Sequence, residues 1–375
     1  MFNLVFALPW LYVATRSIWP LPWDITAKIA VALILLIGSQ FHYWSKLSSG
    51  SVFSPEFPRP VVIVFNWVFG AVVLLAAFQI ALDLAHLVAT AVRVGAGGVW
   101  VMPRYIAGAA AFLLAGFGVS QAARVPRLKD VTVGIANLPE AFDGYTLVQL
   151  TDLHISRLFP PAWTRAVVDA TNALGVDLIV VTGDVIDGSV ANRRAAVAPL
   201  RDLAAREGVY LIPGNHEYLS GYDPWMQHLA GLGMRILANA HVVLTRGDAK
   251  LVLAGVTDPS ARGAGKPIPD LDAALAGAPV GAPVGAPIVL LDHEPSRARQ
   301  AAARGVALQL SGHTHGGMIV GLDRIVARAN GGFVSGRYEV GGMTLYVNNG
   351  TGIWPGFALR LGKPSELTRI TLRRA

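Results

Sequence analysis

Short clusters of carboxylate, amide and imidazole side chains follow one another through the last two thirds of this chain. They read Asp152-Leu153-His154, Gly183-Asp184, Gly214-Asn215-His216-Glu217, His293 and Gly312-His313-Thr314-His315. Oxygen and nitrogen donors without thiolate suit divalent cations such as Mn²⁺, Fe²⁺ or Zn²⁺. The set holds more donors than one ion needs and about as many as two ions need. The sequence therefore predicts a site for two divalent metal ions.

Each cluster comes directly after a short apolar run, which is typical of a buried strand. The predicted strands are 145–150, 176–181, 209–212, 287–291, 306–310 and 344–347, and the predicted helices are 161–174, 192–205 and 296–303. Strands that alternate with helices indicate an α/β domain. Ligands of such sheets bind at the carboxyl ends of the strands, so we expect the clusters to converge there.

Local spacing also favours shared sites. Asp152 and His154 are two residues apart, and in an extended segment such residues lie on the same face. The same holds for His313 and His315. Glycines stand beside the ligands where the backbone must turn sharply or approach an ion closely, at positions Gly183, Gly214 and Gly312. A single Asp or His at a strand end is more often structural, so the prediction depends on the whole set.

The first third of the chain has a different composition. The mean hydropathy of the whole chain is +0.48, and ionisable residues are sparse before about residue 124. Four apolar segments, 2–14, 29–44, 61–82 and 105–119, predict about four membrane spans, because a span needs about 20 mostly apolar residues. Most tryptophans of this part lie near segment ends, as in an interfacial aromatic belt. We therefore divide the chain into an all-α transmembrane region, residues 1–125, and a second domain, residues 126–375.

The basic residues specify the orientation of the spans only weakly. With four spans, both ends lie on one side of the membrane, and a slight excess of Lys and Arg there favours a cytoplasmic second domain. The formal net charge is +7, but no block of Lys and Arg is long enough to indicate binding to nucleic acid or to anionic lipid. The chain has no cysteine, which excludes disulfides, thiolate metal sites and cysteine nucleophiles.

Residues 138–372 resemble the calcineurin-like metallophosphoesterases. The resemblance is carried by Asp-x-His, Gly-Asp-x-x-Asp, Gly-Asn-His-Glu, a lone His and Gly-His-Thr-His in this order. The run Gly-His-Thr-His-Gly-Gly is similar to a branch that joins this domain to membrane-anchoring segments. The resemblance implies two packed mixed β-sheets flanked by helices. It further implies a first metal held by Asp152, His154 and His315, a second held by Asn215, His293 and His313, and a bridging ligand, Asp184.

The resemblance also implies a reaction. Two ions about 3.5–4 Å apart can hold the attacking and leaving oxygens of a phosphoryl group, with a bridging water that loses its proton as the nucleophile. His216 would protonate the leaving oxygen or stabilise the charge on phosphorus, and Asp187 would orient this imidazole and raise its pKa. Glu217 stays open between support of the site and a surface position. Arg360 is a candidate phosphate contact.

The sequence departs from this branch at two places, Met318 and Asn348-Asn349, where substrate contacts are expected to differ. We predict a membrane-anchored phosphohydrolase that acts on phosphodiester or pyrophosphate bonds. Its partners would be the lipid bilayer of a bacterial inner membrane and a phosphorylated substrate, for which the membrane half suggests a lipid link. Two alternatives remain. One is a nuclease or cyclic-nucleotide phosphodiesterase, although no aromatic-interleaved basic stripe favours nucleic acid. The other is a membrane receptor or scaffold with an unused metal site.

Overall fold

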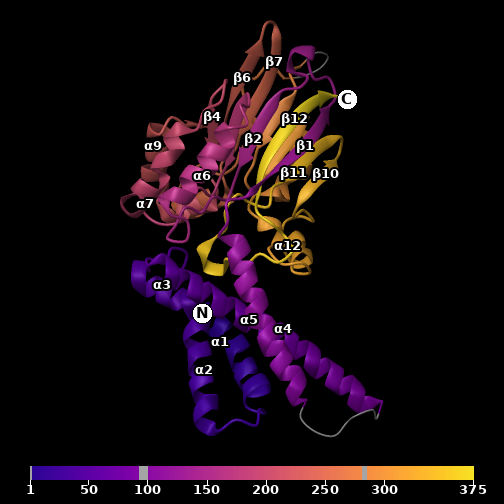
Figure 1. The fold of residues 1–375 in the computed structure, drawn as a ribbon. Coiled ribbons are helices and arrows are strands. Elements are labelled where there is room, and N and C mark those ends of the chain that lie inside the picture. Colours follow the sequence, from indigo (N-terminus) through magenta and orange to yellow (C-terminus); the bar gives the residue numbers. More distant parts are fainter. Residues whose placement is uncertain (1, 93–99, 281–284) are drawn as a thin grey trace. The chain divides into compact units, whose positions relative to one another are not determined.

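The computed structural model describes residues 2–92, 100–280 and 285–375 (Figure 1). The chain forms two units, Met1–Ala123 with Pro355–Leu361, and Arg124–Trp354 with Gly362–Ala375. The first division along the sequence lies close to the boundary expected at residue 125. The short segment Pro355–Leu361 belongs to the helical unit, which the sequence did not indicate.

The helical unit contains fewer membrane-spanning candidates than the four that the sequence predicted. Its helices are α1 (Phe2–Val13), which continues as η1 (Ala14–Ile18), α2 (Ile25–Ser39), α3 (Phe41–Ser49), α4 (Arg59–Ala91) and α5 (Val101–Ala122). Within the described residues only α4 and α5 are long and apolar enough to span a membrane, or three spans exist if α2 and α3, bent by 52°, count as one. The 12 residues of α1 and the 5 of η1 together reach at most about 26 Å, against a hydrocarbon thickness of about 30 Å.

Small residues allow α4 and α5 to pack closely and in opposite directions. A Cβ added at Gly70 would lie 3.6 Å from Cβ of Ala115, and Trp67 Nε1 donates a hydrogen bond of 2.8 Å to the carbonyl of Phe112. Close approach through small residues is typical of packed membrane helices.

The segment Pro355–Leu361 docks onto this helix pair through backbone hydrogen bonds. The Asn66 side chain donates to the Pro355 carbonyl at 2.8 Å and accepts from Ala358 N at 2.6 Å. Arg360 N donates to the Gly118 carbonyl at 3.1 Å. Arg360, a candidate phosphate contact from the sequence, is buried.

The second unit is built on two six-stranded mixed sheets. The first has the order β1-β12-β2-β3-β4-β5 and the second has the order β10-β11-β9-β8-β7-β6. The strands are β1 (Arg127–Ile135), β2 (Thr146–Leu150), β3 (Leu178–Thr182), β4 (Val209–Ile212), β5 (Arg235–Ile236), β6 (Ala240–Arg246), β7 (Ala249–Gly255), β8 (Ile288–Leu291), β9 (Leu308–Ser311), β10 (Gly336–Val340), β11 (Met343–Val347) and β12 (Glu366–Arg374).

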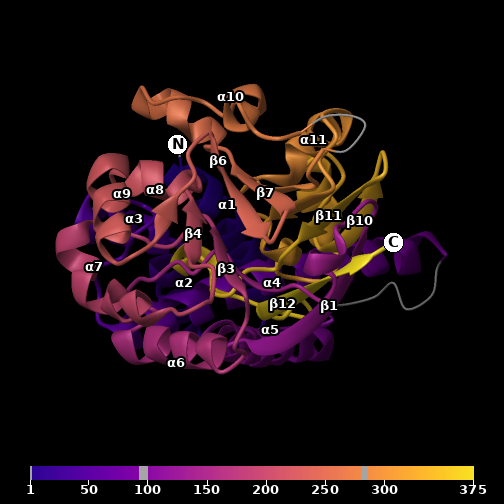
Figure 2. The ribbon, with the colours of Figure 1, turned by 90° about the horizontal axis from the view of Figure 1, so that it is seen from above.

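The two sheets pack face to face over one hydrophobic core. Leu147 and Val180 of the first sheet belong to the same buried cluster as Val289 and Leu310 of the second. Helices flank the sheets, with α6 on one side and α10 and α11 on the other (Figure 2). The helices of this unit are α6 (Pro161–Asn172), α7 (Val190–Val197), α8 (Asn215–Ser220), α9 (Tyr222–Gly231), α10 (Leu271–Leu275), α11 (Ala298–Ala303) and α12 (Asp323–Ala329). The predicted fold class, helical segments followed by two packed mixed sheets with flanking helices, is confirmed.

Candidate metal centre

Parallel pairing brings the carboxyl ends of the ligand-bearing strands to common edges. In the first sheet, Leu150 of β2 pairs with Val181 of β3, and Thr182 of β3 pairs with Ile212 of β4. In the second sheet, Leu291 of β8 pairs with Leu310 of β9. Each predicted cluster follows one of these strand ends within a few residues, so the strand register itself delivers the clusters to one place.

The first donor group gathers around the imidazoles of His154 and His315. Their Nε2 atoms are 3.2 Å apart. Asp152 Oδ1 lies 3.9 Å from the first of these nitrogens and 3.6 Å from the second. Three donor atoms from two distant loops thus face a common point.

The second donor group gathers around the side-chain oxygen of Asn215. This Oδ1 atom lies 3.2 Å from His293 Nε2 and 3.0 Å from His313 Nδ1. Asp184 connects the two groups, because its Oδ2 atom is 3.6 Å from His154 Nε2 and 3.3 Å from His293 Nε2. The structure therefore brings all seven predicted ligands together, with Asp184 between the other two sets.

The spacing and the tautomers of these donors fit bound cations. Metal–ligand bonds of about 2.0–2.2 Å place neighbouring donors of one ion roughly 3.0–3.5 Å apart, which is close to the distances above. His293 Nδ1 lies 2.7 Å from the Thr182 carbonyl, to which it must donate. Nε2 of His293 then faces the Asp184 carboxylate at 3.3 Å. This carboxylate outweighs burial and holds the pKa of His293 well above its usual value, and a bound cation would take the place of the proton at Nε2. A fixed hydrogen bond at the other ring nitrogen is usual for metal-binding histidines.

Backbone strain is concentrated at the predicted ligands. Five of them adopt left-handed φ angles between +43° and +67°, namely Asp152, His154, Asp184, His313 and His315. Such conformations cost about 1–2 kcal/mol each for residues other than glycine. Two strained loops are held by each other, since Asp152 N donates to the Gly183 carbonyl and His154 N donates to the Asp184 carbonyl, both at 3.0 Å. The expectation that residues i and i+2 share a face of an extended segment is wrong here, because these segments are not extended.

Asp187 links the proposed acid to the metal ligands. One of its carboxylate oxygens contacts Nδ1 of His216, and the other lies 3.0 Å from Nδ1 of His154. Burial works against a charged imidazole, but the carboxylates of Asp184 and Asp187 outweigh it and raise the pKa of His216 to about 9. Burial alone would raise the pKa of Asp187, but the two imidazoles hold it below its usual value. The direction for His216 is the one predicted from the sequence.

Glu217 is fully buried and accepts hydrogen bonds from the backbone of the metal-ligand loops. It therefore supports the site and does not lie at the surface. Its Oε2 atom accepts from Asp184 N at 3.0 Å and from Gly214 N at 2.7 Å. Its Oε1 atom accepts from Val185 N at 2.7 Å. One carboxylate therefore fixes the loops after β3 and β4 relative to each other.

Sequence reasoning missed a second supporting carboxylate, Glu366, which has no motif around it. Its Oε1 atom accepts from Asn349 N at 3.0 Å and from the Tyr346 hydroxyl at 2.9 Å, and Lys129 Nζ lies 2.6 Å from Oε2. The loop held in this way passes His315, because a Cβ at Gly350 would lie 3.0 Å from His315 Nδ1. The Asn348-Asn349 departure thus falls in a loop that supports a predicted ligand.

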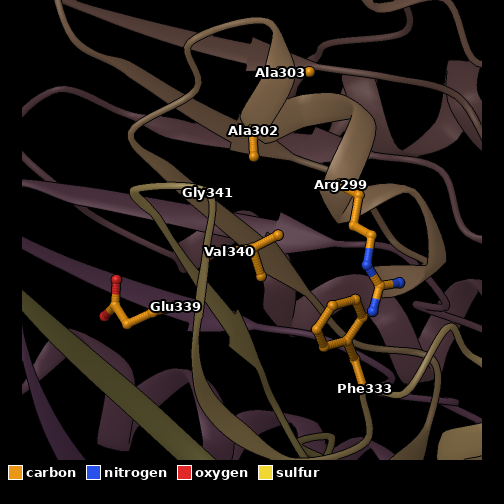
Figure 3. A pocket seen from close by; sticks show the side chains of 7 residues that line it. All are labelled: Arg299, Ala302, Ala303, Phe333, Glu339, Val340 and Gly341. Carbon is orange, nitrogen blue, oxygen red and sulfur yellow. The ribbon is translucent and has the colours of Figure 1, made fainter.

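A pocket of about 490 Å³ lies elsewhere on this unit (Figure 3). The Arg299 guanidinium stacks on the Phe333 ring with 5.1 Å to the ring centroid. Its Nη1 atom donates to the Gly331 carbonyl at 3.0 Å. None of the predicted ligands lines this pocket, so it is separate from the metal centre.

Comparison with known proteins agrees with the fold. Residues 145–317 match the family described as calcineurin-like phosphoesterase. An uncharacterized metallophosphoesterase of Bacillus subtilis, YkuE, is 32% identical, and the match covers 64% of this chain and 84% of that protein. The chain belongs to the calcineurin-like metallophosphoesterase family.

Two further relatives are longer than the part that this chain matches. A zebrafish "transmembrane protein with metallophosphoesterase domain" is 34% identical over 70% of this chain and 61% of that protein. An uncharacterized metallophosphoesterase of Helicobacter pylori is 31% identical over 66% of this chain and 64% of that protein. The chain thus matches a little over three fifths of the length of these two relatives.

Proposed function

We propose that this protein is a membrane-anchored hydrolase of phosphodiester or pyrophosphate bonds that uses two divalent metal ions. The observation that carries the proposal is the position of Asp184 Oδ2, 3.6 Å from His154 Nε2 and 3.3 Å from His293 Nε2. A carboxylate oxygen between two sets of nitrogen and oxygen donors suits a ligand shared by two cations.

The residues of the chain have separate tasks in this reaction. When bound, the two ions activate water and polarise the phosphoryl oxygens. His216 holds a proton at Nε2 for the leaving oxygen, since its Nδ1 is engaged by Asp187. The raised pKa of His216 keeps this proton in place at neutral pH. Glu217 and the Asp187 carboxylate fix the loops that carry the ligands.

Membrane anchoring is supported by the two long apolar helices and by the name of the zebrafish relative. We extend the proposal to a substrate with a lipid link, in a bacterial inner membrane, because a domain joined to membrane helices works next to lipid. The basis for this extension is proximity along the chain, so it needs a test of its own.

An activity screen tests the hydrolase proposal. Purified protein in detergent would be loaded with Mn²⁺ or Zn²⁺ and offered 4-nitrophenyl phosphomonoesters, phosphodiesters and soluble pyrophosphates. The variant Asp184→Asn should lose at least 100-fold in kcat/KM. The same chemical change at Asp169, whose side chain is 64% exposed on α6, should leave kcat/KM unchanged. Equal activity of the Asp184→Asn variant and the wild type would refute the proposed role of the bridging carboxylate.

A second assay tests the lipid link. A phosphodiester with a diacylglycerol group in mixed micelles would compete against the same headgroup ester without acyl chains. A higher kcat/KM for the lipid at equal bulk concentration supports the extension. A clear preference for the soluble ester rejects the lipid link and leaves the hydrolase proposal in place.

A further inference from the structure

We propose that the helical unit holds a second binding site, a pocket for the phosphate group of a membrane phospholipid, formed around Arg16 and Arg104. This inference rests on the membrane anchoring proposed above. It is independent of the hydrolytic reaction, because it uses none of the metal-centre residues.

The lengths of the helices place these charges at a membrane boundary. Asp83 follows Arg59 by 24 residues in α4, a distance of about 36 Å at 1.5 Å per residue, which exceeds a hydrocarbon core of about 30 Å. The antiparallel register of α4 and α5, in which Gly70 faces Ala115, brings Arg104 to the level of Asp83. Beside them, Trp23 Nε1 donates to the Tyr105 hydroxyl at 2.8 Å, as expected of aromatic residues at headgroup depth.

Hydrogen bonds fix one arginine of the pocket in advance. Asp83 accepts from Arg16 Nε at 2.9 Å, from the Tyr12 hydroxyl at 2.7 Å and from Gln79 Nε2 at 2.8 Å. This carboxylate ties the N-terminal helix to α4 and neutralises one guanidinium. The cluster is therefore rigid on one side before any ligand binds.

The second arginine brings a charge that the cluster does not balance. Arg104 donates from Nε to the Arg16 carbonyl and from Nη1 to the Trp100 carbonyl, both at 3.0 Å. These are neutral acceptors, and no carboxylate is paired with Arg104 among the residues that the structure describes. The sequence between 93 and 99 contains no Asp or Glu either. Two guanidiniums beside one carboxylate leave a net charge of +1, which matches the single negative charge of a phosphodiester.

The shape and lining of the pocket suit a lipid headgroup. Its volume is about 210 Å³, and it is lined by Arg16, Pro20, Leu82, Asp83, His86, Trp100 and Arg104. Guanidinium N–H groups bind phosphate oxygens in pairs. Leu82, Pro20 and the Trp100 ring, which meets the His86 ring edge-on at 5.2 Å, supply apolar walls for the glycerol end. Basic pockets between membrane helices are a known form of headgroup recognition.

Native mass spectrometry of the full chain in detergent tests this site. Phosphatidylglycerol and diacylglycerol with the same acyl chains would be titrated separately against wild type, Arg104→Gln, Arg104→Lys and Arg59→Gln. Arg59 lies at the other end of α4 and serves as a matched control. We expect wild type and Arg59→Gln to retain phosphatidylglycerol over diacylglycerol, Arg104→Gln to bind it at least 10-fold more weakly, and Arg104→Lys to fall between them.

Two further measurements keep the outcomes separate. The thermal unfolding midpoint of each Arg104 variant should stay close to that of the wild type, because the two carbonyls that the Arg104 side chain bonds among the described residues lie near the surface, where solvent can replace the lost donor. Carbonate extraction of membranes tests anchoring: release of the protein would reject both the anchoring and this pocket. In a protein that resists extraction, equal binding of diacylglycerol, or unchanged phosphatidylglycerol binding by Arg104→Gln, would overturn the pocket alone.

Discussion

Replacing Gly214 with alanine would push a methyl group against the bridging carboxylate. A Cβ at this position would lie 2.3 Å from Asp184 Oδ1 and 2.7 Å from Asp184 N. Gly214 has φ −100° and ψ −171°, which is extended backbone that any residue adopts. The Gly214→Ala variant therefore adds no backbone strain, and its effect reports the contact with Asp184 alone.

The size of the effect follows from the distance. Reaching a normal contact of about 3.5 Å requires a relative movement of about 1 Å. Excess packing of this kind costs about 1–3 kcal/mol of stability. A misplacement of about 1 Å at a reacting centre lowers the rate by roughly 100-fold. We expect both effects, together with weaker metal binding, because Asp184 lies between both donor groups.

The assay combines kcat/KM on a phosphodiester, a Mn²⁺ titration and the thermal unfolding midpoint without metal. The matched control is Gly231→Ala, at the end of α9, where a Cβ would meet nothing within 4 Å. That variant should keep wild-type kcat/KM. If the Gly214→Ala variant binds two ions with wild-type affinity and keeps wild-type kcat/KM, the reasoning about the position of Asp184 is refuted.

Three further changes have defined outcomes. His216→Ala should slow esters of poorly acidic alcohols at least 100-fold more than 4-nitrophenyl esters, since a good leaving group needs no acid; a uniform loss across a leaving-group series would contradict the assigned role. The kcat/KM of the wild type should fall at basic pH as His216 loses its proton. The midpoint of this fall should lie below pH 9, because bound cations offset part of the Asp184 charge that raises the pKa of His216 to about 9. The kcat/KM of His216→Ala should not show this fall. Glu217→Gln should lower the free energy of unfolding in urea by about 1–3 kcal/mol, because a Gln offers one acceptor oxygen to three buried N–H groups. An unchanged urea midpoint together with wild-type kcat/KM would contradict the positioning role of Glu217.

The ligand set could be found from the sequence because the strands that carry it are local and apolar. Each short apolar run predicts a strand, and the polar cluster after it marks the end of that strand. Once parallel pairing is assumed, the strand ends share an edge, as Leu150 and Val181 do. All seven predicted ligands therefore meet, although five of them adopt a left-handed backbone conformation instead of an extended one.

The features that escaped prediction depend on long-range contacts. β12 pairs with both β1 and β2, and about 240 residues of sequence separate it from β1. Glu366 supports the Asn348–Gly350 loop beside His315 only because of this pairing. The docking of Pro355–Leu361 onto α4 is also a contact between distant parts of the sequence. It escaped prediction because a short segment of ordinary composition does not indicate which helix it will contact.

The number of membrane spans was predicted from apolar length, which ignores helix boundaries. The second apolar segment is divided between α2 and α3, which bend by 52°. The first forms a 12-residue α-helix that continues for only 5 residues as η1. Hydropathy detects apolar segments reliably but does not locate the bends that decide whether a segment crosses.

Anomalous diffraction from crystals of the Mn²⁺-loaded protein tests the central claim most directly. We expect two manganese peaks about 3.5–4 Å apart, one beside His154 and His315 and the other beside His293 and His313, with Asp184 touching both. A single peak, or two peaks that do not share Asp184, would contradict the account.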